Sequence, residues 1–141
     1  MIGIGQPGRI AFDFTRAADS AFDAISSAFA DVKRVVPDAK LIEATPDLVG
    51  LTDVADIVGC SRQNIRKIMV SSGGTFPLPV HEGKSVLWHL SSVLIWLNER
   101  KSYQVADCLL EIASINRQLN VAKEMAAIDQ APRIEILSLV S

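Results

Sequence analysis

The chain has 141 residues, of which 49% are hydrophobic and 21% charged, and its formal net charge is −2. This length allows one compact domain, or a small domain with an added oligomerisation element, and excludes two large domains. No stretch reaches the roughly 20 consecutive apolar residues of a membrane helix, and the N-terminus lacks a secretory signal pattern. We therefore expect a soluble, cytoplasmic protein that does not bind membranes.

The N-terminal third predicts a strand, a helix and a second strand. Residues 9–15 alternate apolar and polar side chains, as a half-buried strand does. Residues 18–36 place apolar side chains at helical spacing, with Asp19 or Ser20 as the N-cap, and residues 39–44 have strand composition. We predict a βαβ unit here. Two strands cover a helix poorly, so this unit should pair with a second copy or with another part of the chain.

Residues 51–69 have the pattern of two short helices joined by a tight turn. A first helix from Thr52 places the small Ala55 where a second helix must cross closely, and Gly59 follows at the turn. Ser61 is suited to cap the second helix. The apolar residues of both helices then face each other: Val54, Ile57 and Val58 on the first, Ile65, Ile68 and Met69 on the second. This spacing predicts a helix-turn-helix.

The outward face of the second helix is polar and carries no acid. No carboxylate occurs between Asp56 and Glu82, and residues 51–101 carry a net charge of +2 between flanking segments of −2 each. Arg can bond bidentately to guanine, Gln or Asn to adenine, while Lys and Ser suit phosphates. An ordinary solvated helix surface is the alternative. The composition favours DNA contact by Ser61, Arg62, Gln63, Asn64, Arg66 and Lys67.

A string of motifs follows this helix pair. It consists of the turn Phe76-Pro77-Leu78-Pro79-Val80, then Gly83, Trp88 and the helix-ending pair Trp96-Leu97. With these motifs, residues 48–101 resemble the winged helix-turn-helix of the AlpA and excisionase group, small relatives of the MerR regulators. The resemblance covers about a third of the chain, and the whole string is far more specific than the helix pair alone.

The resemblance implies roles for individual residues. It assigns Arg62, Gln63, Asn64, Arg66 and Lys67 to the DNA groove, and it assigns His81, Lys84 and Ser85 to a wing beside the phosphates. Glu82 next to Lys84 makes this wing nearly neutral, whereas the wing of the group is usually more basic. The two tryptophans stand in apolar runs, and we expect both to pack in the core.

The C-terminal segment predicts a long helix over residues 102–130. Two interpretations of its apolar spacing stay open: a coiled-coil-like seam, or an amphipathic helix packed on its own domain. Pro132 should stop the helix, and residues 133–140 have strand composition. The residues of the seam are Val105, Cys108, Ile112, Ile115, Leu119, Ala122 and Ala126.

These segments together predict a mainly helical α+β fold. It has an N-terminal βαβ unit for dimerisation or sheet completion in residues 1–47, and a central winged helix-turn-helix DNA-binding domain in residues 48–101. Residues 102–141 form a long C-terminal helix with a short strand-like tail, which we expect to serve oligomerisation. No internal repeat or low-complexity segment is visible.

Other signals do not point to chemistry. Residues 3–8 spell G-x-G-x-x-G but precede a strand, not a helix, so we expect no dinucleotide there. His81, His89 and the two cysteines lack metal-ligand spacing, and the cysteines should be reduced and buried. We expect no cofactor, no metal and no catalysis.

The predicted function is sequence-specific binding of double-stranded DNA. We expect a transcriptional regulator that binds as a homodimer to two half-sites. One alternative is an excisionase-like architectural protein that bends DNA, and another is an antitoxin-like module that binds a protein partner.

Overall fold

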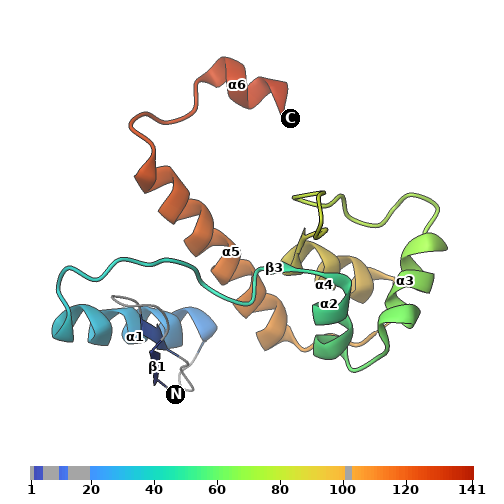
Figure 1. Cartoon of the computed structure of the whole chain (residues 1–141), viewed down its shortest axis with the longest axis horizontal. Helices are drawn as coiled ribbons and strands as arrows, with labels where there is room; N and C mark the ends of the chain where they lie inside the picture. Colours follow the sequence, from blue (N-terminus) through green and yellow to red (C-terminus); the bar gives the residue numbers. More distant parts are fainter. Residues whose placement is uncertain (1, 5–9, 13–19, 101–102) are drawn as a thin grey trace.

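The computed structural model describes residues 2–4, 10–12, 20–100 and 103–141, and within these it is mainly helical (Figure 1). The predicted α+β class is confirmed. The helices are α1 (Ala21–Val35), α2 (Leu51–Val58), α3 (Arg62–Val70), α4 (Leu90–Glu99), α5 (Asp107–Ala127) and α6 (Ile134–Leu139). The strands are β1 (Ile2–Ile4), β2 (Ile10–Phe12), β3 (Leu48–Val49) and β4 (Trp88–His89), paired as β1–β2 and β3–β4, both antiparallel.

The N-terminal segment is a hairpin followed by a helix. Strand β2 confirms the centre of the predicted first strand, but its partner is β1, in the register Ile2 to Phe12. Helix α1 begins after Ser20, whose hydroxyl oxygen accepts from the amide of Asp23 at 3.1 Å. The G-x-G-x-x-G stretch lies largely outside the described residues, as do the ends of the predicted strand over 9–15.

The second predicted strand, residues 39–44, is wrong, and with it the βαβ unit. This segment is extended but its backbone pairs with side chains of α5 instead of another strand. The amide of Ala44 donates to Asn120 Oδ1, and Asn120 Nδ2 donates back to the Ala44 carbonyl, both at 2.8 Å. Lys123 Nζ donates to the carbonyl of Ile42. Backbone groups satisfied in this way need no strand partner.

The core lies beneath α2, α3 and α4. Val54, Ile65, Leu90, Leu94 and Leu97 are among its fully buried side chains. The short β3–β4 pair joins the start of α2 to the start of α4, and the amide of residue 90 donates to the Asp47 carbonyl. This small sheet thereby fixes the two helices that carry most of the core.

The predicted core positions of both tryptophans are confirmed. Trp88 is 6% and Trp96 9% exposed, and the ring of Phe76 stands edge-on to each, with centroids 5.8 and 5.1 Å apart. The indole N–H of Trp88 donates to the Pro77 carbonyl at 3.0 Å. The Pro-rich turn is thus tied to the core through aromatic packing and a hydrogen bond.

Helix α5 packs on its own chain, along α1 and α4 (Figure 1), as one of the two interpretations of its apolar spacing predicts. The buried stripe differs from the predicted seam. Ala113 and Asn116 are the buried residues of α5, whereas Cys108, Ala122 and Ala126 are exposed. Of the other seam residues, Val105 is buried and Ile112, Ile115 and Leu119 are half-buried, so apolar spacing located the buried side of this segment only in part. The stripe also contains asparagines that bond to residues 44–47, which apolar spacing does not indicate.

The predicted strand in the C-terminal tail is also wrong. Residues 134–139 form α6 and no strand, and α5 ends at Ala127, ahead of Pro132. The cysteines are free, but Cys60 is only half-buried and Cys108 is exposed, so their predicted burial is wrong. Within the described residues, no helix is long and apolar enough to cross a membrane.

Candidate nucleic-acid interface

The turn between α2 and α3 has the predicted geometry. Gly59 has φ 79, the left-handed conformation that glycine adopts without a steric penalty. The amides of Gly59 and Cys60 both donate to the Ala55 carbonyl at 2.9 Å. Ser61 Oγ then accepts from the Asn64 amide at 3.1 Å and starts α3. The predicted turn and N-cap are therefore confirmed.

One side of α3 is fixed to the core. Ile65 is fully buried, and Ile68 and Met69 pack against the same cluster as Val54 and Ala55 of α2. Because these contacts recur every three to four residues, they set the rotation of α3 about its axis. The opposite side must then face solvent.

The solvent-facing part of α3 and its N-cap carry the predicted groove residues, and all six are exposed: Ser61, Arg62, Gln63, Asn64, Arg66 and Lys67. Arg62 and Arg66 lie one turn apart, as do Gln63 and Lys67, so the helix presents two adjacent polar rows. Among the residues that the structure describes, no carboxylate pairs with Arg62, Arg66 or Lys67. Their charges are available to an external anion.

Asn64 is held at the edge of this face by a contact that the sequence did not predict. Its side-chain amide donates to the hydroxyl of Tyr103, which follows α4. The hydrogen bond with Cys60, followed by burial, raises the pKa of the Tyr103 hydroxyl above its ordinary value, while Asn64 acts in the opposite sense. Tyr103 is therefore neutral at physiological pH, and it orients Asn64 without adding charge.

A further residue of the face is Val70, which is 73% exposed and lies one turn beyond Arg66. The sequence analysis did not identify Val70 because it directly follows Ile68 and Met69, two apolar residues expected on the buried side of the helix. An exposed apolar side chain on a basic helix face can contact the methyl group of thymine. The pattern of exposed residues on α3, once the buried side is known, is the signal that identifies it.

The predicted wing residues lie in a short turn after α3. His81 and Leu87 form one antiparallel bridge, with Leu87 N donating to the His81 carbonyl at 3.0 Å. His81, Lys84 and Ser85 are all exposed. A Cβ at Gly83 would meet His81 Nε2 at 2.8 Å, so the imidazole lies against the glycine. In the described part of the chain, no hydrogen bond or ion pair connects this turn to α3.

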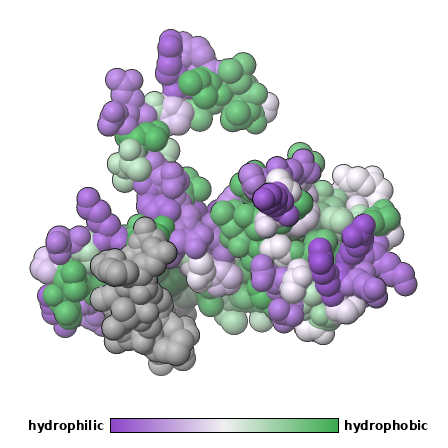
Figure 2. Space-filling view, in the orientation of Figure 1, coloured by the Kyte–Doolittle hydropathy of each residue, from purple (hydrophilic) through white to green (hydrophobic). Residues whose placement is uncertain are grey.

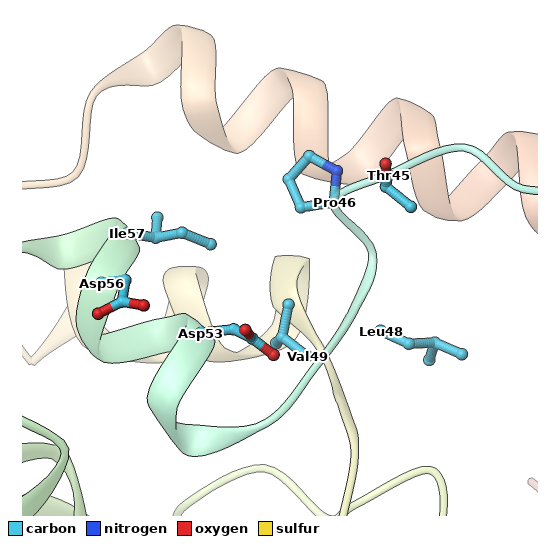
Figure 3. A pocket seen from close by; sticks show the side chains of 7 residues that line it. All are labelled: Thr45, Pro46, Leu48, Val49, Asp53, Asp56 and Ile57. Carbon is cyan, nitrogen blue, oxygen red and sulfur yellow. The ribbon is translucent and has the colours of Figure 1, made fainter. Parts of the chain in front are cut away.

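An open hollow of about 330 Å³ lies between the connector before α2 and the outer side of α2 (Figure 3). Its walls carry Asp53 and Asp56, and Asp53 Oδ2 already accepts from the Gly50 amide at 3.0 Å. Two carboxylates would repel phosphate, so this hollow is unsuited to DNA. The described residues contain no group of three or more potential metal ligands.

The chemistry of the α3 face is the basis for assigning a function. The chain matches no protein-family model, no curated protein and no solved structure. Guanidinium and amide groups in two rows on one rigid helix can donate to guanine and pair with adenine, and the lysine can contact phosphate.

Proposed function

We propose that residues 48–101 form a winged helix-turn-helix that binds double-stranded DNA in a sequence-specific manner. In this proposal α3 enters the major groove, and the turn around Gly83 lies beside the phosphate backbone. The chain would act as a transcriptional regulator that binds two half-sites as a homodimer. We also propose that residues 48–101 are related to the AlpA and excisionase group, which they resemble in sequence.

The observation that supports the proposal most is the unpaired cationic face of α3. Arg62 and Arg66 are exposed on a helix whose other side packs on the core through Ile65, and no carboxylate neutralises them among the described residues. An ordinary solvated helix surface mixes both signs of charge. A rigid face with cations and amides, and without acids, favours a polyanion that displays base edges.

The acidic total charge is compatible with this proposal. Screening limits the effect of distant charges to about 10 Å at 0.1 M salt, so local potential governs contact with DNA. Several of the acidic residues belong to α1 and α5, which are separate helices from α3. Between Arg62 and Lys84 in the sequence, Glu82 is the one acid. Helix α3 itself carries three cations and no acid, although the whole chain carries −2 and the neighbouring α2 carries Asp53 and Asp56.

The proposal is tested by selecting bound fragments from a random pool of double-stranded DNA with the full-length protein. We expect an enriched motif, and an affinity for it that falls as salt rises because bound phosphates release counterions. A palindromic motif with half-sites one helical turn apart would report the homodimer. No enriched motif and no salt-dependent affinity would contradict the proposal.

A further inference from the structure

The C-terminal arm, residues 133–141, has no packing partner within the described part of its own chain. None of its residues is buried, and Ile134, Leu139 and Val140 are each more than 80% exposed. Figure 2 shows this arm as a projection on which hydrophobic residues lie beside hydrophilic ones. An isolated helix of six residues is unstable in water, because ordering its first turn costs more free energy than its few hydrogen bonds contribute. The arm therefore requires a surface that covers its apolar side.

A matching groove lies between α4 and α5. It has a volume of about 470 Å³, and its lining combines three apolar residues, Ile95, Val121 and Ala122, with four polar ones, Ser91, Ser114, Arg117 and Gln118. Ile95 and Val121 are 49% and 52% exposed, which is unusual for residues on the faces of two packed helices. The groove is open to solvent and is lined by α5 residues from Ser114 to Ala122, so a short helix with an apolar side can reach it.

The groove also contains one cation without a counter-charge. Arg117 Nη1 donates to Ser92 Oγ at 2.9 Å and to Ser91 Oγ at 3.4 Å, and these bonds hold the guanidinium at the groove wall. No carboxylate in the described ranges pairs with it. The remaining guanidinium N–H groups can donate to a carboxylate in the bidentate geometry that Arg favours.

The arm supplies the complementary charge. Glu135 is the one acid of α6, and its local partner Arg133 lies at 3.6 Å with both side chains about three-quarters exposed. Such an exposed pair is worth little and is readily exchanged. On the helix, Glu135 and Ser138 form a polar edge beside the apolar residues. A groove with apolar residues and one arginine thus complements an apolar helix with one glutamate.

We propose that this groove receives the C-terminal arm of a second copy of the chain, with Glu135 of one copy bound to Arg117 of the other. The exchange is reciprocal, so two identical contacts form around a twofold axis. The segment that connects α5 to the arm favours binding to a second copy over binding to the groove of the same chain. Ile128 (ψ 143) and Arg133 (ψ 149) are extended and flank Pro132, so the arm points away from α5 (Figure 1).

This inference specifies the homodimer of the proposed function but does not require DNA. Its test is the mass of the full-length protein in solution without DNA, measured by light scattering during gel filtration. We expect a dimer for the wild type. The variant Ile134→Asp/Leu137→Asp should be monomeric and keep its helical circular dichroism, because neither side chain contacts the core. A monomeric wild type, or a dimeric arm variant, would overturn the proposal.

Charge-reversal variants distinguish two arrangements. In one, the arm binds the groove of a second copy; in the other, it folds back onto the groove of its own chain. Arg117→Glu and Glu135→Arg should each weaken the dimer at least about tenfold, because like charges then face each other. Mixing the two single variants should restore a heterodimer in which both contacts are complementary. Restoration only when both changes are in one chain, with no effect of mixing, would show closure within the chain and overturn the proposal.

A folding control keeps this test decisive. Arg117→Glu removes the bonds to Ser91 and Ser92, so thermal unfolding of this variant is measured first. If it is unfolded, Arg117→Gln replaces it, since the amide keeps a donor but removes the charge. Mixing Arg117→Gln with Glu135→Arg should then restore one complementary contact, between the native Arg117 of one copy and the native Glu135 of the other, and no restoration would contradict the exchange. Glu135→Arg and the arm variant change only exposed positions. An α3 variant that loses DNA binding but remains dimeric would separate this inference from the DNA-binding proposal.

Discussion

Gly59 determines how α3 leaves α2. Its φ of 79 turns the chain sharply, and its amide closes α2 by donating to Ala55. A Cβ at this position would meet nothing within 4 Å, so the restriction comes from backbone conformation and not from space. The position of the proposed recognition helix therefore depends on one residue that tolerates a left-handed backbone.

The variant Gly59→Ala should lower the free energy of unfolding by about 1 kcal/mol. The left-handed conformation costs a residue with a Cβ about 1–2 kcal/mol, and the reduced entropy of the unfolded chain offsets part of this loss. Gly59→Asn is the matched control and should lose less, because asparagine tolerates this conformation better. Urea denaturation measures both, and an alanine variant as stable as the wild type would contradict the account.

At the scale of single residues, the sequence predicted the features that depend on the residue itself and its near neighbours along the chain. Gly59, the Ser61 cap and the buried tryptophans follow from turn conformation, capping and bulk. The bond from Asn64 to Tyr103 joins residues that are 39 positions apart, and nothing in the spacing of either indicates it. Contacts of this kind arise only after the helices pack.

At the scale of elements, the connector before α2 depends on α5. Asn120 bonds to both backbone groups of Ala44 and donates to Asp47 Oδ2 at 2.9 Å. Asp47 is 1% exposed and its other oxygen contacts His89 Nδ1 at 2.7 Å. One amide thus joins the connector, the start of β3 and β4 to the long C-terminal helix.

The variant Asn120→Ala should lower the free energy of unfolding by about 2–3 kcal/mol. It leaves a nearly buried carboxylate with one partner fewer and frees two backbone groups, and each lost partner costs about 1–3 kcal/mol in such a site. The control Gln118→Ala removes an exposed α5 amide that bonds only to Ser114, and it should change stability by less than about 0.5 kcal/mol. Equal effects of the two changes would refute this role for Asn120.

The same contact explains which elements the sequence predicted poorly. Helices α2 and α3 have apolar stripes that packing uses directly, so apolar spacing predicted this pair. Residues 39–44 have strand composition, but their partners are side chains about eighty residues away, in a helix whose buried face includes asparagines. Residues 134–139 are rich in β-branched and apolar residues yet form α6, so composition alone did not decide between strand and helix.

At the scale of the whole molecule, the α3 face and the C-terminal arm are two surfaces formed by different residues. Three cations without a carboxylate partner among the described residues lie on α3, two acids line the hollow beside α2, and five exposed apolar residues lie on the C-terminal arm. This separation assigns DNA contact to one surface and contact between copies to another. Variants of one surface should therefore leave the other function intact, because the two sites share no residue.

The central claim is that the outward face of α3 reads DNA, and it is tested by the affinity of Arg62→Ala/Arg66→Ala for the selected DNA site. We predict a loss of about 30-fold or more with unchanged thermal stability, since each bidentate arginine contributes about 1–3 kcal/mol. The control Arg34→Ala/Lys40→Ala removes the same charge from exposed positions elsewhere and should bind nearly as well as the wild type. An α3 variant that binds the site as tightly as this control would contradict the account.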